Sequence, residues 1–119
     1  MGCLARAFRT AFLACLAASD ALKHSVRGNR WRALRSLNEA RDLYLQLVAA
    51  QEGVTFPQFG AVSLENAGRP VPVTLAQTLP PDLEPDSLGA AVRALATELK
   101  PFIESYGLAG LVRALGLAG

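Results

Sequence analysis

A short break at Gly28 and Asn29 separates two long helical patterns and constrains the fold more than any other feature of this sequence. Before the break, apolar residues recur at three- and four-residue spacing from Leu4 to about Val26, and a second such pattern runs from Arg30 to about Glu52. We expect Gly28 to end the first helix and Asn29 to cap the second. A connection this short predicts that the two helices pack as antiparallel neighbours.

The apolar stripes of these two helices are the faces that we expect to meet in the hairpin. The stripe of the first helix, with Leu16 beside it, comprises Phe8, Phe12, Cys15, Ser19, Leu22 and Val26. The stripe of the second helix, which stops at Gly53, comprises Trp31, Leu34, Leu37, Tyr44 and Val48. We therefore interpret Trp31 as a core residue.

The rest of the chain predicts a long packed loop followed by further helices. Residues 53–85 hold six of the seven prolines, but their apolar residues Phe56, Phe59, Val62 and Leu64 predict a segment packed across the hairpin, with a short helix from Val73 to Leu79. We expect Asp86 to cap a helix from Ser87 to about Lys100, Pro101 to kink or end it, and a short helical piece to follow, with the last residues fraying or packing on a partner.

Together these elements predict one domain over residues 1–119, of the all-α class. It would be an antiparallel bundle of four to five helices, composed of a hairpin (4–52), a packed loop (53–85) and C-terminal helices (86–115). At 51% hydrophobic and 18% charged residues the chain is too apolar for disorder, and some apolar surface is expected to meet a partner. A net charge of +2 does not indicate nucleic acid as a partner.

Few residues are suited to metal binding or catalysis. Cys3, Cys15 and His24 are the only cysteines and histidine, which excludes a zinc site of four cysteines or of two cysteines and two histidines. We interpret both cysteines as reduced core residues, and His24, near a helix C-terminus, as a dipole partner or surface residue. No GxSxG, GxxxxGK[ST], HExxH or CxxC motif occurs. We predict no enzymatic activity and no cofactor for this chain alone.

The N-terminal segment has a basic start and a short apolar run, as a signal peptide does. The run lies within a longer helical pattern, and no stretch approaches the roughly 20 apolar residues of a membrane span. We therefore predict a cytoplasmic protein with no membrane contact.

Arginines gather at the turn between the two long helices and form the best candidate contact site. Arg27, Arg30, Arg32 and Arg35 gather at a helix start, where the partial charge already favours anions, and Trp31 is a further possible contact there. This pattern predicts contacts to a phosphate-bearing ligand or an acidic partner, with Asp20 of the facing helix as a further contact. The alternative is that these arginines are only solvated, with Arg35 paired to Glu39.

Charged residues within the helices allow two other interpretations. Arg41 interrupts an apolar stripe, so its charge needs a partner or water, and Asp20 and Asp42 are predicted to form a structural polar network with it, with Glu39 as another candidate. Alternatively, Asp20, Glu39, Asp42 and Glu52 line a cleft for a polycationic small molecule, although carboxylates in this pattern more often form a solvated face.

Two segments resemble a known family. The run "LKHSVRGNRWRALRSLNEARDLYLQLVAAQEGVTFP", and later "LAQTLPPDLEPDSLGAAVRALATEL", resemble the C-terminal helical domain of bacterial nucleotidyltransferases of the aminoglycoside and lincosamide adenylyltransferase type. The resemblance covers about residues 20–100. The matching positions are Arg27, Gly28, Trp31, Ala33, Leu37, Ala40, Arg41, Leu45, Gly53, Leu75, Thr78, Leu79 and Pro80.

The resemblance implies an accessory role. In that family an N-terminal α/β domain with a "GS" turn and a D-x-D metal pair transfers the nucleotide, and this chain has neither motif. Its nearest aspartates, Asp82 and Asp86, stand four apart with Pro85 between them. ATP and Mg²⁺ would thus belong to a catalytic partner, a separate domain or protein on which this chain packs while it walls off the acceptor-substrate cleft.

Two further functions stay open. The apolar composition also fits a self-associating helical interaction protein, such as a homodimer. The resemblance extends to ribonucleases of the HEPN class, which share an R-x(4 to 6)-H motif. In this chain the required arginine positions hold Ala17, Ala18 and Ser19, and this disfavours ribonuclease activity.

Overall fold

The computed structural model describes residues 2–117, and the side chains from residue 5 onward. Its α-helices are α1 (Gly2–Val26), α2 (Arg30–Gln51), α3 (Ala61–Asn66), α4 (Pro85–Ser105) and α5 (Ala109–Ala114). Two short 3-10 helices, η1 (Pro57–Phe59) and η2 (Val73–Thr78), lie in the connecting segment. No strand occurs within residues 2–117, so the predicted all-α class is confirmed.

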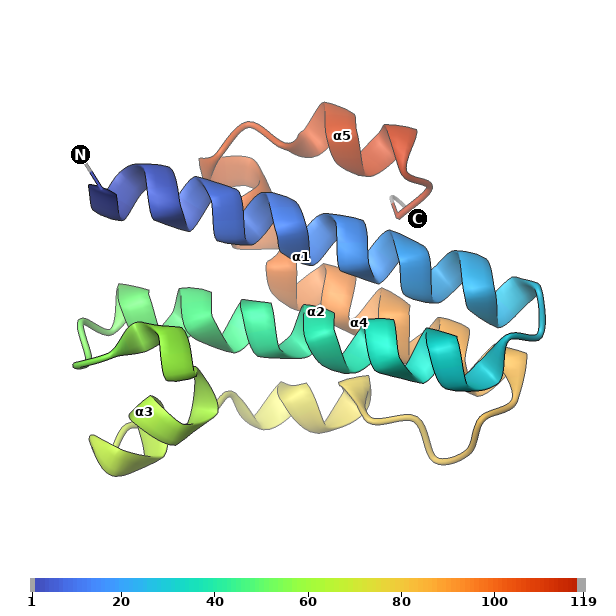
Figure 1. Cartoon of the computed structure of the whole chain (residues 1–119), viewed down its shortest axis with the longest axis horizontal. Coiled ribbons are helices and arrows are strands. Elements are labelled where there is room, and N and C mark those ends of the chain that lie inside the picture. The colour runs from blue at the N-terminus through green and yellow to red at the C-terminus, as the bar shows by residue number, and fades with distance from the viewer. Residues whose placement is uncertain (1, 118–119) are drawn as a thin grey trace.

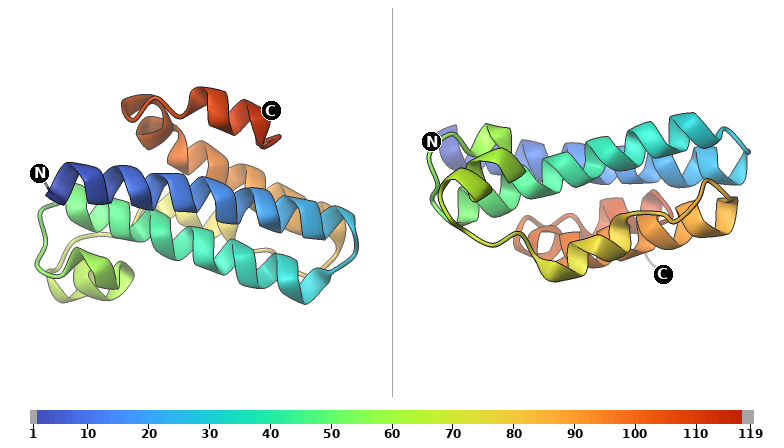
Figure 2. Two further views of the ribbon diagram at one scale, coloured as in Figure 1. Left: turned by 45° about the horizontal axis from the view of Figure 1, so that its top comes forward. Right: turned by 90° about the horizontal axis from the view of Figure 1, so that it is seen from below.

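The helices lie in two layers. α1 and α2 run antiparallel side by side, as the sequence predicts, and their connecting turn lies at one end of the molecule, with α3 at the opposite end (Figure 1). η2, α4 and α5 form a second layer beneath this hairpin (Figure 2, right). The hydroxyl of Ser19 on α1 donates to the carbonyl oxygen of Leu115, 3.1 Å away, and so ties the end of α5 to the first layer.

The buried face of α1 differs from the predicted stripe. Small residues fill it: Ala11, Ala14, Cys15, Ala17, Ala18 and Ala21. Phe8 and Val26 are the first and last residues of the predicted apolar stripe. They are 43% and 78% exposed, so the prediction is wrong at both ends of the stripe. The reason is steric, because a face of alanines lets two helix backbones approach more closely than bulky side chains do. Burial of Cys15 agrees with its predicted place in the core, and Cys3 lies outside the described side chains.

The buried face of α2 also differs at its start. Leu37 and Tyr44 are buried as predicted, together with Ala33, Ala40, Leu45 and Leu47. Trp31 is 74% exposed, so its interpretation as a core residue is wrong. The buried face of this helix starts instead at Ala33, two residues further along the chain.

Three predicted helix ends need correction. Asn29 precedes α2, but its side chain makes no capping hydrogen bond. Helix α4 begins at Pro85 after Glu84, two residues earlier than the start at Ser87 that a cap at Asp86 predicts, since proline is well suited to the first helical position. Pro101 does not end the helix, which continues to Ser105.

The connecting segment packs only in part. Leu64 and Leu75 are buried, but Phe56, Phe59 and Val62 are 61%, 59% and 57% exposed, so most of the predicted apolar cover is at the surface. Position 60 favours glycine, because its φ is +57° and a Cβ there would lie 3.3 Å from Oδ1 of Asp42.

At the C-terminus Val112 and Leu117 are buried, and residues 118–119 lie outside the described part. Among the described helices, none has the length and apolar character needed to cross a membrane.

Candidate functional site

The turn between α1 and α2 carries an exposed basic surface around one tryptophan. We call this surface the arginine end and define it by Arg27, Arg30, Trp31, Arg32 and Arg35, all of which are exposed. In residues 2–117 only Arg30 of these arginines makes an ion pair, at 3.6 Å from Glu84, and both of those side chains are at least half exposed. Such a pair contributes little free energy because water screens it. The arginine end is thus largely unpaired positive charge beside an exposed indole.

A hollow of about 510 Å³ lies beside Trp31. It is lined by Asp20, Trp31, Arg32, Arg35, Ser36 and Glu39. The structure therefore brings four of the predicted contact residues together, whereas Arg27 and Arg30 lie outside this hollow. Ser36 is a lining residue that the sequence analysis missed, since a serine within a helix carries no pattern that marks it as a contact.

Asp20 joins the two long helices. The Ser36 hydroxyl donates to its Oδ2 at 2.5 Å, and Nε2 of His24 lies 3.3 Å from its Oδ1. The Ser36 hydrogen bond holds the pKa of the Asp20 carboxyl below its ordinary value, and the charges of His24, Arg32 and Lys23 act in the same direction against the effect of burial. Asp20 thus has a structural role among the residues that line the hollow.

His24 is buried, which corrects its predicted surface position. It is 3% exposed, and the side-chain amide nitrogen of Asn29 lies 3.1 Å from its Nδ1. An amide nitrogen donates, so Nδ1 accepts and the ring proton of the neutral form is on Nε2, facing Asp20. Asn29 therefore holds the imidazole in place and leaves α2 uncapped. Nε2 itself has no hydrogen bond of good geometry among the described residues.

The Ser36 contact gives a pH-dependent prediction. A carboxyl whose folded pKa lies below its unfolded value of about 3.9 stabilises the fold above that pH, and this contribution is lost as pH falls through the folded pKa. Ser36→Ala should therefore lower the free energy of unfolding at pH 7, and the difference from wild type should shrink below about pH 4. Urea unfolding at both pH values measures this, with Ser105→Ala as the control at an exposed site. A difference that stays constant with pH would contradict the role of Asp20.

Arg41 has other partners than the predicted carboxylates. Its Nε donates to Oγ1 of Thr78 at 2.8 Å, and its Nη2 donates to the Thr78 carbonyl oxygen at 2.6 Å. A third bond, 2.7 Å long, reaches Oδ1 of Asn38. The predicted network of Arg41 with Asp20 and Asp42 is therefore wrong, since Arg41 turns toward η2, while Asp20 lies at the α1–α2 contact. Burial lowers the pKa of the Arg41 guanidinium.

Tyr44 and Glu98 form a second polar link between the layers. The Tyr44 hydroxyl lies 3.4 Å from Oε1 of Glu98, which also accepts a 2.8 Å hydrogen bond from Thr74 of η2. Burial and the nearby Glu98 carboxylate raise the pKa of Tyr44 to about 12. The phenol is therefore neutral at physiological pH, and the cluster serves to hold α2, η2 and α4 together.

The acidic residues do not gather into one cleft. Asp20 and Glu39 line the hollow beside Trp31 together with two arginines, while Glu52 pairs with Arg69 at 3.4 Å and Asp42 accepts a long hydrogen bond from Gln46. The alternative of a carboxylate-lined site for a polycation thus has no support from these positions. The described residues include no cluster of three or more potential metal ligands.

Comparisons with known proteins give no relative for this chain. No protein-family model matches it, and neither a curated protein nor a solved structure matches significantly.

Proposed function

We propose that this chain is a non-catalytic helical accessory domain that docks through the arginine end on a catalytic nucleotidyltransferase domain. The observation that carries the docking is Trp31, which is 74% exposed among four exposed arginines. Exposing an indole to water is unfavourable, and tryptophan and arginine are the residues most enriched among those that dominate binding free energies. The partner surface is acidic or carries phosphate, since it has to match these charges.

The partner class comes from the resemblance noted in the sequence. Two of the segments that carry it meet in space, because Arg41 of the α2 segment donates to Thr78 of the "LAQTLP" segment. This contact is consistent with one helical unit, and a bundle of four to five helices with α1, α2 and α4 as its body is part of the proposal. ATP, Mg²⁺ and the acceptor substrate belong to the partner, and the proposed location is the cytoplasm.

Substitution of Trp31 tests the docking. The chain is tagged and purified under mild conditions from its own cells, and the bound proteins are identified by mass. Trp31→Ala should weaken binding of a nucleotidyltransferase by about 2 kcal/mol or more, which is roughly thirtyfold. The double change Arg32→Glu and Arg35→Glu should abolish it by placing like charges together. Binding is measured with the purified pair.

The control is Phe59→Ala, which removes another exposed aromatic residue, in η1 next to α3. Helix α3 lies at the end of the molecule opposite the arginine end (Figure 1). This variant should bind as wild type does. Absence of any nucleotidyltransferase from the purified complexes, or equal weakening by both aromatic substitutions, would refute the proposal. Transfer of nucleotide by the isolated chain with ATP and Mg²⁺ would refute its non-catalytic character.

A self-associating protein is the second candidate, favoured by the exposed apolar group Phe56, Phe59 and Val62. These side chains line a hollow of about 560 Å³ beside α3. A concentration-dependent mass of twice 12.6 kDa in sedimentation, abolished by Phe59→Ala, would favour this function. The weaker alternative, RNA cleavage, gains nothing from His24, since a residue that is 3% exposed offers no base to a bound RNA.

A further inference from the structure

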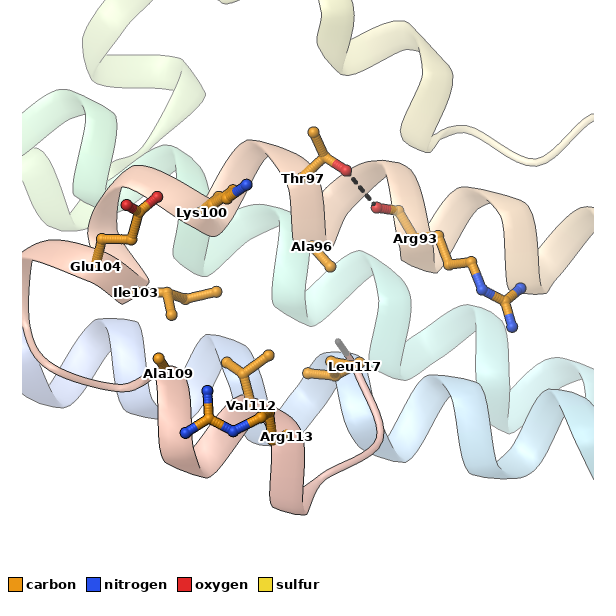
Figure 3. Close-up of a pocket in the computed structure, with 10 residues that line it drawn as sticks. All are labelled: Arg93, Ala96, Thr97, Lys100, Ile103, Glu104, Ala109, Val112, Arg113 and Leu117. Carbon is orange, nitrogen blue, oxygen red and sulfur yellow. Dashed lines mark hydrogen bonds between the residues drawn. The ribbon is translucent and has the colours of Figure 1, made fainter. Parts of the chain in front are cut away.

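A groove of about 410 Å³ lies between α4 and α5, far along the chain from the arginine end. Its volume falls within the range of about 300–1,000 Å³ that is typical of small-molecule sites. Ile103, Val112 and Leu117 gather in the space between the two helices, as Figure 3 shows. Each of these three side chains is nearly buried, so the groove has an apolar floor.

Three cationic residues are among those that line the groove. Arg93 and Lys100 come from α4 and Arg113 from α5, and the two arginines lie at different sides of the groove (Figure 3). All three are exposed, and none makes an ion pair with another described residue. Glu104 is the one carboxylate among the lining residues. The groove therefore has an excess of positive charge above an apolar base.

The other polar groups at the groove do not compete for a ligand. The Thr97 hydroxyl donates to the carbonyl oxygen of Arg93 on its own helix, 3.1 Å away, and is thereby occupied (Figure 3). Recognition of a polar head group thus falls to the cations, and recognition of a tail falls to the aliphatic floor. Guanidinium and ammonium groups bind carboxylate and phosphate oxygens through charge-assisted hydrogen bonds.

We propose that the groove between α4 and α5 binds a small amphipathic anion, namely an alkyl chain that ends in a carboxylate or a phosphate. The chain lies on Ile103, Val112 and Leu117, and the head group meets the cations at the rim. The lining segment of α4 from Arg93 to Glu104 is about 16 Å long at 1.5 Å per residue, so the ligand is a single short chain. This inference is independent of the docking proposed for the arginine end.

The test is a titration of the isotope-labelled chain with decanoate, followed by amide chemical shifts. Saturable shifts should appear in residues 93–104 and 109–117 and spare α3. Decyl phosphate should produce the same pattern, and the tighter of the two anions identifies the head group. Decyltrimethylammonium, with the same tail and the opposite charge, should bind at least about tenfold more weakly. Equal binding of the cation, or shifts spread over the molecule, would overturn the proposal.

Two sets of variants test separately how the groove recognises the tail and how it recognises the head group. Ala109→Trp places a bulky ring at the groove and should abolish the saturable shifts, whereas Ala114→Trp, on the same helix at an exposed position outside the lining, should not. The double change Lys100→Gln and Arg113→Gln should weaken the binding of decanoate by roughly tenfold. Arg35→Gln should leave the affinity for decanoate unchanged. Amide shifts outside α4 and α5 confirm that each variant is folded. Binding that survives Ala109→Trp would refute the site.

Discussion

Replacing Arg41 by methionine should destabilise the fold by about 2–3 kcal/mol. The change removes three hydrogen bonds from a charged donor, two of which hold Thr78 at the end of η2. Thr78 is fully buried, so water does not replace the lost donors. Methionine keeps a long flexible side chain and a high helix propensity, and the measured loss therefore reports the hydrogen bonds rather than the helix.

Arg35→Met is the matched control, since Arg35 lies on the same helix, is exposed and makes no hydrogen bond or ion pair with another described residue. Its effect should stay within about 0.5 kcal/mol. Urea unfolding followed by circular dichroism measures both variants. Equal losses of unfolding free energy in the two variants would mean that Arg41 does not anchor η2. The contact between the two segments that carry the family resemblance would then contribute nothing measurable to stability.

Leu37→Ala should cost more, about 2–5 kcal/mol. Leu37 has no exposed surface and belongs to the cluster that α1, α2 and α4 share. Its truncation removes apolar contacts and leaves a cavity that rigid neighbouring helices cannot fill. Alanine does not weaken the helix itself, so the loss measures packing alone.

Leu13→Ala is the control for Leu37, because it makes the same chemical change at a site on α1 that is 40% exposed. Leu13→Ala should lower the free energy of unfolding by well under half as much as Leu37→Ala does. If the two leucines proved equally important, α1 and α2 would have to pack through different faces from those described. The position of the arginine end relative to the core would then have to be revised.

The helix positions followed from local signals, whereas the buried faces did not. Gly28 and Gly53 mark chain reversals whatever the rest of the chain does, so the bounds of α1 and α2 could be predicted to within about two residues. The buried face of a helix depends on its neighbours. The apolar pattern favours large side chains such as Phe8 and Trp31 for the core, but the close contact of α1 with α2 selects alanine.

The candidate site could be predicted in part for the same reason. The arginines lie at a turn, and turns are exposed, so their accessibility followed from the sequence. The partners of Asp20, His24 and Arg41 depend on which residues face each other across helices. Ser36 lies in no pattern that marks it, and Thr78 is part of the resemblance without a role assigned to it. Only the packed structure identifies them as hydrogen-bonding partners.

The three-residue turn at Gly28, between α1 and α2, also bears on how fast the chain folds. Proteins dominated by contacts between residues near in sequence fold fastest, since little loop entropy is lost before such contacts form. The α1–α2 hairpin is the largest local unit of the molecule, and the turn that closes it is near the short end of those that join helical hairpins. We expect the hairpin to form early and α4, separated from it by more than thirty residues, to complete the core later. Substitutions within the hairpin seam should then slow refolding, whereas substitutions on α4 should mainly speed unfolding.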